Sequence, residues 1–553
     1  MSQPTEPAPP RLSFGVELEF AVLYVFGSNK VVSSAPPGKY FDDGLPQPLE
    51  IPYPAHEKAP DLDNIAQYTV EKAIRDTLEA AGFPVQVAPA EPTDTVAEQR
   101  LDQYRHWQVG RDVSVSAIDI PKYEEGIRAA SIEIGTPVEW DSPLAFEAVR
   151  YAVNLLASQF RIQVNTSTGM HVHVGNGPAF MPYQWVKRMA MLCWAADRLL
   201  ATLNPPTRSW NFFCPGIRDF SRLARNELED EPPIHLAQQR GETFLSATLK
   251  CEPYVATDVR FGERSTLWRE THAHEETVAR FGQTRLPGHF EPFIDENAPV
   301  TCYPSAARHE DPQVPLDQYT HNLNNAPSNV SSDRSSPQPI DKTRHKSVDL
   351  TQAELAEKTA ALEDIKARVG VRKRINGFQR LKLPRWTEED LRNIDDVNQL
   401  NGGHDMSSWG DPAIDRGVWF GVERIAQTKA SCQIDNMLRR GSRYNYNFRS
   451  YECGPIGNTS VPSKRTVEWR QAAGSMDGKW VSVWSRIVVG VSRFAVHAPV
   501  DEFLRILTCC DYAEKGGSYD VLDLLEDMGL VAEAEVAGQR IWDDGDKWGL
   551  EYE

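Results

Sequence analysis

The sequence lacks the features that define three large classes of protein. Its eight cysteines are scattered over 553 residues, with no CxxC or CxxxC pair, which argues against a disulfide framework or a zinc cluster. Acidic residues outnumber basic ones, 78 to 59, so nucleic acid is not expected as the main partner. The longest apolar-rich stretch, Met181–Leu203, contains charged side chains at 187, 188, 197 and 198, which excludes a membrane span.

Composition along the chain predicts an interrupted organisation. Met1–Pro10 has no basic residue and no apolar run, so no secretory signal is recognised and a cytoplasmic location is expected, with the nucleus as the alternative. Residues 301–349 have few large apolar side chains and are expected to be a disordered linker. The other expected parts are a disordered tail at 1–10, a sheet domain in two parts at 11–220 and 415–500, an insertion of uncertain structure at 221–300, a helical part of the insertion at 350–414, and an acidic helical tail at 501–553.

Hydrophobic periodicity predicts an α+β fold. Apolar and polar residues alternate from Leu12 to Phe20, as on a strand, whereas apolar residues recur every three or four positions over Pro143–Phe160, as on a helix. The other expected strands are Val85–Ala88, Trp107–Val109, Ala130–Glu133, two segments within Arg161–Val174, Val418–Phe420, Tyr444–Phe448 and Arg465–Ala472. The other expected helices are Ile65–Ala81, Met181–Leu203, Leu350–Arg368, Asp435–Arg439 and Trp480–Ala495.

Three of these strands carry pairs of polar residues spaced two positions apart. Side chains at this spacing project to the same face of a strand. The pairs are Glu17 and Glu19, His171 and His173, and Glu468 and Arg470, while Glu133 lies alone between two isoleucines. Each pair by itself is typical of an exposed strand face or a surface ion pair. Their joint occurrence, with apolar neighbours throughout, indicates one shared polar face inside the fold.

The chemistry of such a face favours a divalent cation and a phosphate. Several carboxylates with an imidazole form an oxygen-rich ligand set, suited to Mg²⁺ or Mn²⁺ more than to structural zinc. An arginine beside them suits phosphate or carboxylate recognition. Carboxylates, a divalent cation and an arginine are the parts that phosphoryl transfer from a nucleotide requires. The sequence has no GxxxxGK[ST] and no GxGxxG after a strand, so ATP would be held through metal.

These residues resemble the glutamine synthetase and glutamate–cysteine ligase superfamily, and most closely the amidoligase family common in filamentous fungi. The resemblance rests on short blocks that occur in the same order as in the family, over roughly 11–220 and 415–495. The blocks are Phe14-Gly-Val-Glu-Leu-Glu-Phe20, Ser131-Ile-Glu-Ile134 with Pro137, Thr168-Gly-Met-His-Val-His-Val-Gly175, Asn204-Pro-Pro-Thr-Arg208, Tyr444-Asn-Tyr-Asn-Phe448, and Thr466-Val-Glu-Trp-Arg-Gln471 with Gly474 and Asp477.

The resemblance implies a curved antiparallel sheet with helices on its convex face and a funnel for ATP and metals on its concave face. It implies that Arg470 contacts the transferring phosphoryl group, that His173 contacts the nucleotide or phosphate, and that Arg208 and Asn447 contact substrate or phosphate. By the same resemblance, the expected metal ligands are Glu17, Glu19, Glu133, His171 and Glu468. The carboxylate that should accompany Glu133 is open, with Glu139 as one choice, and the insertion has no counterpart.

The expected activity is ATP-dependent ligation of a carboxylate to an amine through an acyl phosphate, with Arg470, Glu468 and Glu17 as catalytic residues. Small-molecule or peptide carboxylates and amines are the expected substrates, and the sequence does not define their identity or the oligomeric state. Two alternatives stay open: a protein of the same fold that binds partners without catalysis, and a metal-dependent hydrolase that uses His171 and His173. The hydrolase is less favoured because carboxylates outnumber histidines.

Overall fold

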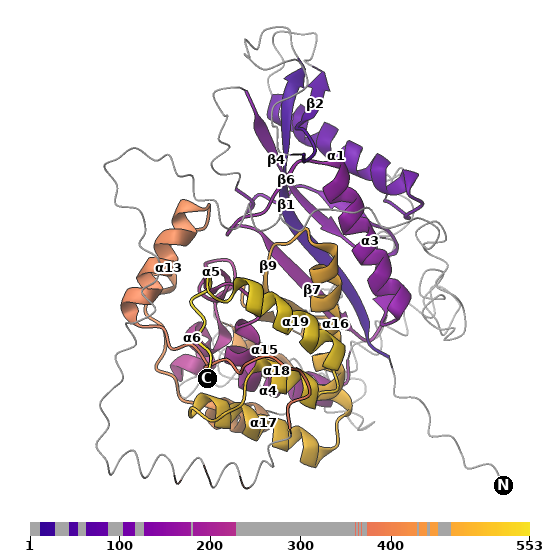
Figure 1. The fold of residues 1–553 in the computed structure, drawn as a ribbon. Helices are drawn as coiled ribbons and strands as arrows, with labels where there is room; N and C mark the ends of the chain where they lie inside the picture. Colours follow the sequence, from indigo (N-terminus) through magenta and orange to yellow (C-terminus); the bar gives the residue numbers. More distant parts are fainter. Residues whose placement is uncertain are drawn as a thin grey trace, which may run out of the picture.

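One long strand, β1 (Ser13–Gly27), runs through the middle of a β-sheet and organises the molecule (Figure 1). Our computed structural model describes residues 11–27, 44–52, 62–86, 103–116, 126–177, 181–227, 360, 363, 367, 373–428, 431–439, 443–451 and 466–553. Within these residues, the sheet has nine strands in the order β3-β4-β1-β7-β9-β8, and β2, β5 and β6 also pair with β1. The sheet is open, and its pairs are antiparallel except for β1 with β2.

The elements of the described residues have the following bounds. The remaining strands are β2 Leu49–Pro52, β3 Gln108–Gly110, β4 Arg128–Gly135, β5 Glu139–Trp140, β6 Ile162–Gln163, β7 Gly169–Gly175, β8 Tyr446–Asn447 and β9 Thr466–Ala473. The α-helices are α1 Leu62–Ala80, α3 Pro143–Gln159, α4 Tyr183–Ala201, α5 Pro206–Ser209, α6 Ile217–Phe220, α7 Arg222–Arg225, α13 Glu388–Leu400, α14 Val418–Ala426, α15 Ser431–Leu438, α16 Gly478–His497, α17 Val500–Glu514, α18 Val521–Asp527 and α19 Val531–Asp544.

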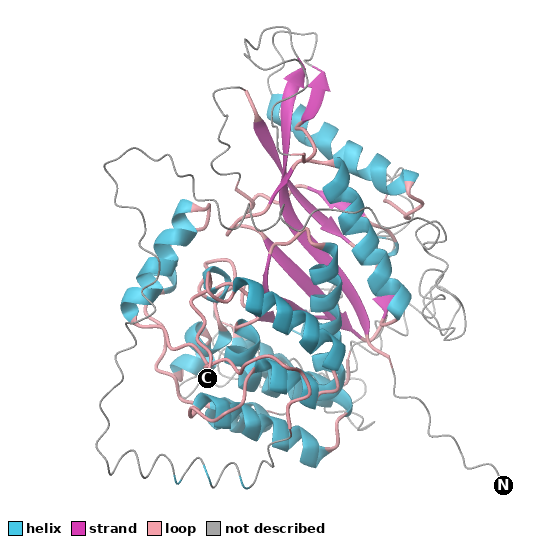
Figure 2. Cartoon of the chain, viewed as in Figure 1, coloured by secondary structure: helices cyan, strands magenta, loops and turns pink. Residues whose placement is uncertain are grey.

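The apolar face of the sheet packs against helices. Val16, Leu18 and Phe20 of β1 are buried in a large hydrophobic core, and Phe14 stacks on Phe146 of α3 with ring centroids 4.5 Å apart. Helix α1 contacts β4 and α3, and α16 contacts β7 and α3. Figure 2 shows the strands as one continuous sheet with α1 and α3 lying along it. This cover leaves the opposite face of the strands to polar side chains.

Local sequence explains where several of these helices begin and end. Ser142 caps α3 by accepting a hydrogen bond from the Ala145 N–H, and Pro143 occupies the first turn, where its missing N–H leaves no helical bond unmade. Helix α4 ends at Ala201, shortly before Pro205 and Pro206, because the residue that precedes a proline is disfavoured in a helix. This stop directs the chain back toward the sheet.

The structure confirms the α+β class and most expected elements of the sheet and its helices. One strand prediction was wrong: Val418–Phe420 begins α14, where Val418, Val422 and Ile425 are buried at helical spacing. Three consecutive apolar residues cannot distinguish a strand from a buried helix. Of Val85–Ala88, Val85 forms an isolated bridge with Trp107, and residues 87–88 lie outside the described residues.

Other predictions fall partly or wholly outside the described residues. These are the tail at 1–10, the linker at 301–349, most of the insertion at 221–300, and most of Leu350–Arg368, of which residues 360, 363 and 367 are helical. The domain boundaries stay predictions, as does the funnel of the glutamine synthetase type.

The C-terminal residues are helical, as expected, and they belong to the same core as the sheet. Phe503 of α17, Leu524 of α18 and Ile541 of α19 are buried in it. Arg218 of α6 is fully enclosed and bonds Glu514 of α17 in an ion pair, which ties this region to the chain that follows α4. None of the described helices combines the length and the apolar character that crossing a bilayer demands.

Candidate active site

Strand register brings the predicted polar residues together on one face of the sheet. Glu17 of β1 lies opposite His171 of β7, and Glu19 lies opposite Glu133 of β4. On the next strand, His173 lies opposite Glu468 of β9. Residues directly opposite one another on antiparallel strands have neighbouring side chains. Side chains that are far apart in the sequence therefore converge because β1 and β7 are adjacent at the centre of the sheet.

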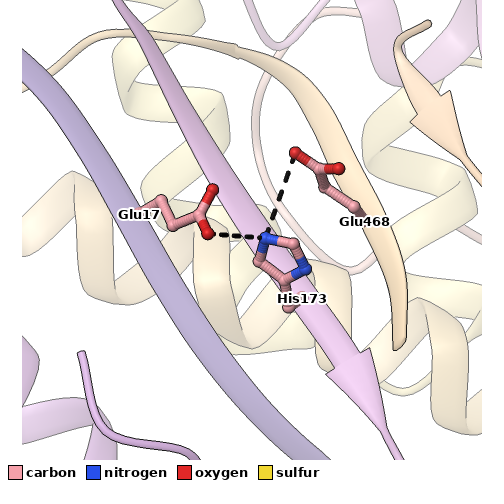
Figure 3. A group of neighbouring side chains, drawn as sticks. All are labelled: Glu17, His173 and Glu468. Carbon is pink, nitrogen blue, oxygen red and sulfur yellow. Dashed lines mark ion pairs between the residues drawn. The ribbon is translucent and has the colours of Figure 1, made fainter. Parts of the chain in front are cut away.

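Glu17, His173 and Glu468 form the tightest group. One potential ligand atom from each lies within 4.8 Å of the others, and Figure 3 shows both carboxylates beside the imidazole. The Nε2 atom of His173 is 3.2 Å from Oε1 of Glu17 and 3.9 Å from Oε1 of Glu468. All three side chains are largely buried, with 17%, 9% and 12% exposed for Glu17, His173 and Glu468. The group is thus compact and shielded from bulk water.

His171 lies deeper, between three carboxylates. Its Nδ1 atom is 3.4 Å from Oε2 of Glu17 and 3.6 Å from Oε1 of Glu468, and its Nε2 atom is 3.5 Å from Oε1 of Glu19. The Nε2 atoms of His171 and His173 are buried and form no hydrogen bond with the part of the chain that the structure describes. Buried polar atoms normally have a partner, so these two nitrogens are suited to a ligand.

Neighbouring groups hold the carboxylates and His173 in place. Asn447 of β8 donates from Nδ2 to Oε2 of Glu468 at 2.8 Å, and the Gly169 N–H donates to Oε2 of Glu19 at 2.7 Å. The Thr466 hydroxyl lies 3.0 Å from Nδ1 of His173. Such contacts around a site orient the groups that bind a metal. In the structure, Asn447 therefore contacts the Glu468 carboxylate.

Arg470 lies beside this group and shares one of its oxygens. Its Nη1 atom donates to Oε1 of Glu468 at 2.6 Å and lies 3.3 Å from Nδ1 of His171. The same Oε1 atom of Glu468 lies 3.9 Å from Nε2 of His173. A possible cation site and a fixed positive charge are therefore contiguous, as phosphoryl transfer requires.

The Glu19 carboxyl is buried among charges of both signs. Burial raises the pKa of Glu19 to about 8, and the Asp112 and Glu133 carboxylates act in the same direction, whereas Arg470 and Arg208 oppose them. Glu19 itself is 5% exposed. Clustered carboxylates need nearby cations to remain ionised together, so this end of the site is suited to a positive charge.

His171 and Glu468 have the protonation states that metal ligands need. Burial lowers the pKa of His171 to about 4, and Arg470 contributes in the same direction. Burial alone would raise the pKa of Glu468, but Arg470, His173 and His171 lower it to about 2. A neutral imidazole and an ionised carboxylate are the forms that ligate metals.

The donor set fits a divalent cation. Glu17, His173 and Glu468 offer converging ligand atoms, with His171 and Glu19 directly behind them. Two imidazoles with several carboxylates are compatible with Mg²⁺ or Mn²⁺. The residues present therefore fit the cation that the sequence predicts.

Arg208 is buried inside the protein, next to the main chain of the strand that carries Arg470. It is 2% exposed, and its Nη2 atom donates to the main-chain oxygen of Arg470 at 2.7 Å. Its guanidinium lies against Gly169, where a methyl group would collide with it and with the His171 ring. Arg208 thus contacts the strand that carries Arg470.

Two further carboxylates, those of Glu139 and Asp112, could not be placed from the sequence. Glu139 of β5 lies opposite Phe14, whose side chain belongs to the apolar face, so the register does not place it beside Glu133. Asp112, which sequence reasoning missed, acts on the Glu19 carboxyl together with Glu133. It follows β3 two residues after Gly110, which pairs with Glu133. The only signal for it was this position, which needs the strand register to interpret.

The class defined so far is an α+β protein with an open sheet and a carboxylate–imidazole–arginine cluster on its polar face. Residues 10–248 match the family model described as "putative amidoligase enzyme", so this segment is similar to the amidoligase family. The match includes Glu17, Glu19, Glu133, His171, His173 and Arg208. It ends before Asn447, Glu468 and Arg470, which the sheet brings to the same site. No curated protein and no solved structure matches the chain.

Proposed function

We propose that this protein is an ATP-dependent carboxylate–amine ligase, with a sheet related to that of glutamine synthetase. The observation that carries the proposal is the position of Glu468. One oxygen of this carboxylate faces both His173, in the group suited to a divalent cation, and the Arg470 guanidinium. This arrangement places ligands for the cation and a positive charge for the phosphate of a metal-bound nucleotide within one site. The amidoligase family match supports the same reaction class.

In this proposal, Glu17, His173 and Glu468 hold Mg²⁺ or Mn²⁺, and His171, Glu19 and Glu133 form the adjoining ligands. His173 thereby takes the place of an inner ligand that the family resemblance gave to His171, because its Nε2 atom lies closest to Glu17. When bound, the cation would neutralise phosphate oxygens and orient them for transfer. ATP would be held by the cation and by Arg470, because the sequence has no Gly-rich phosphate loop.

The residues of the chain would then act as follows. Arg470 neutralises negative charge on the transferring phosphoryl oxygens, since its guanidinium stays protonated. Asn447 keeps the Glu468 carboxylate in one orientation through its hydrogen bond. The substrate carboxylate attacks the γ-phosphorus and releases ADP, which gives an acyl phosphate. The amine then attacks the acyl carbon, releases phosphate and a proton, and forms the amide.

The first prediction tests this reaction. The purified full chain is incubated with Mg²⁺-ATP and a panel of carboxylates and amines, and ADP and phosphate are followed. We expect phosphate release that requires a carboxylate, and a loss on the order of 100-fold in Glu17→Gln and in Glu468→Gln, because each removes charge from the transition-state site. Glu535→Gln is the matched control, since Glu535 is exposed on α19.

Other outcomes would contradict the ligase. If the protein does not bind nucleotide, and if the wild type and Glu468→Gln respond alike to Mg²⁺-ATP in a thermal shift assay, a binding protein of the same fold is favoured. Metal-dependent hydrolysis that proceeds without ATP would favour the hydrolase.

A further inference from the structure

The strand that carries Arg470 contains an irregularity beside the site. The pairing of β7 with β9 is regular from Gly175–Thr466 to Val172–Trp469, and it shifts by one residue before Met170–Ala472. Arg470 and Gln471 therefore both lie opposite His171, which is a β-bulge. Bulges next to active sites redirect side chains. The direction of Arg470 thus depends on what fixes this bulge.

The segment Asn204–Arg208 binds the main chain of β9 at the bulge and directly after it. Arg208 donates to the oxygen of Arg470 at 2.7 Å, and Oδ1 of Asn204 accepts from the Ala473 N–H at 3.3 Å. The main chain of Arg470 has two more contacts from outside β7. Its N–H donates to the Asn445 oxygen at 2.8 Å, and the Cys214 thiol lies 3.0 Å from its oxygen.

The segment is built to keep its shape. Pro205 and Pro206 stand between its two contact residues, and each proline ring fixes one backbone dihedral. Both Asn204 and Arg208 are 2% exposed. The Nε and Nη1 atoms of Arg208 are buried without a hydrogen bond to the described residues, and burial of incompletely paired charge is costly. Arg208 is buried despite this cost, and its hydrogen bond within the described residues is directed at the bulge, which indicates a function for that bond.

We propose that Asn204 and Arg208 are positioning residues that hold the bulge of β9 and thereby set the direction of the Arg470 side chain. This inference rests on the proposed function, in which Arg470 contacts the transferring phosphoryl group. The bulge begins after Val172–Trp469, so the pairing of His173 with Glu468 precedes it. We call the two contacts from Asn204 and Arg208 to β9 the clamp. Loss of the clamp should therefore disturb Arg470 and spare the group formed by Glu17, His173 and Glu468.

The second prediction tests the clamp with Arg208→Met, which keeps an apolar stem and removes the donor. Arg188→Met is the matched control, because Arg188 also donates to a main-chain oxygen, that of Ala498, at 2.6 Å and away from the site. In Arg208→Met we expect kcat to fall on the order of 10-fold to 100-fold, as displacement of a catalytic group by about 1 Å can produce. Affinity for Mn²⁺ alone should change far less than kcat, because the group formed by Glu17, His173 and Glu468 keeps its register and only a charge near Glu19 is lost.

A double-mutant cycle with Arg470→Met separates positioning from an independent role. If Arg208 acts through Arg470, the double variant has the kcat of Arg470→Met alone. Additive losses, an equal loss in Arg188→Met, or a parallel fall in Mn²⁺ affinity would overturn the inference. Asn204→Leu removes the other contact, should lower kcat in the same way, and serves if Arg208→Met does not fold.

A readout without catalysis keeps this test separate from the ligase proposal. Hydrogen exchange of the amides at 471–473 should be faster in Arg208→Met than in the wild type and in Arg188→Met, since the bulge loses an anchor. If exchange rises while the wild type shows no ATP chemistry, the ligase fails and the clamp stands. If the wild type is active and exchange is unchanged, the clamp fails.

Discussion

At the scale of single residues, neighbouring positions on one strand have different tasks. His171 and His173 project to the same face of β7, as their spacing predicts, yet their surroundings differ. His171 is enclosed by Glu17, Glu19 and Glu468. His173, in contrast, has the Thr466 hydroxyl beside its Nδ1 atom. Spacing could predict that both face the site, but the depth of each depends on the adjacent strands.

Asp197 of α4 provides a pH-dependent prediction at this scale. Burial raises its pKa from 3.8 to about 7, and the Asp219 carboxylate adds to this, while Arg198, Arg218 and a hydrogen bond from Asn445 oppose it. The unfolded chain therefore ionises at lower pH than the native protein. The contribution of Asp197 to the free energy of unfolding falls as pH rises from about 4 to about 7.

Asp197→Asn should abolish this decline. The difference between a pKa of 3.8 and one of about 7 corresponds to about 4 kcal/mol, which is an upper limit for the effect. Urea denaturation at pH 4.5 and at pH 7.5 measures it: the stability of the variant relative to wild type should be greater at the higher pH. Asp543→Asn, at an exposed position of α19, is the control. A relative stability that does not change with pH would contradict the prediction.

At the scale of elements, α16 shows how a residue noticed for its position in a motif can have a structural role. Asp477 follows the last block of the family resemblance. In the structure it caps α16, accepting hydrogen bonds from the N–H groups of Lys479 at 2.9 Å and Trp480 at 3.3 Å. Helix α16 packs on β7 and α3, against the apolar face of the sheet. The cap therefore supports the site from behind.

Asp477→Ala should lower the free energy of unfolding by about 1 kcal/mol, because two N–H groups at the helix start lose their acceptor. Asp477→Ser retains a capping oxygen and should recover most of the loss. Chemical denaturation gives the stability, and Mn²⁺ titration should show unchanged affinity in both variants. A fall in Mn²⁺ affinity with no change in stability would place Asp477 in the site instead.

Strands with strict alternation were predictable from sequence, and irregular contacts were not. Glu17 and Glu19 between apolar neighbours predicted both β1 and its polar face. Val418–Phe420 has no such period, and it begins a helix where a strand is expected. The bulge at Arg470 and the approach of Asp112 to Glu19 depend on pairing between strands that are far apart in sequence. Local patterns contain no information on such pairing.

At the scale of the whole molecule, the site needs both halves of the sheet. Strands β1, β4 and β7 precede residue 248, whereas β8 and β9 follow residue 445. A chain limited to residues 1–248 would leave β7 as a sheet edge, with all seven of its residues normally buried. Such an apolar, unpaired edge promotes aggregation.

The corresponding prediction is that the fragment 1–248 is insoluble or aggregated when expressed alone. The soluble fraction and size-exclusion chromatography measure this. The control is the full chain carrying Glu468→Gln and Arg470→Met, which loses the side chains but keeps the strand and should remain soluble. A folded, monomeric fragment would show that β7 does not depend on β9.

The pairing of β7 with β9 also decides whether two distant parts of the chain meet in the correct register at the site. His173 contacts Thr466 across 293 positions of sequence. The chain between these two residues is not a simple loop, because it includes α4 and the segment Asn204–Arg208, which pack against the sheet, and β8, which belongs to it. A shift of one residue at the Gly175–Thr466 pair would turn Glu468 and Arg470 away from the site, whatever the length of the chain between the two strands.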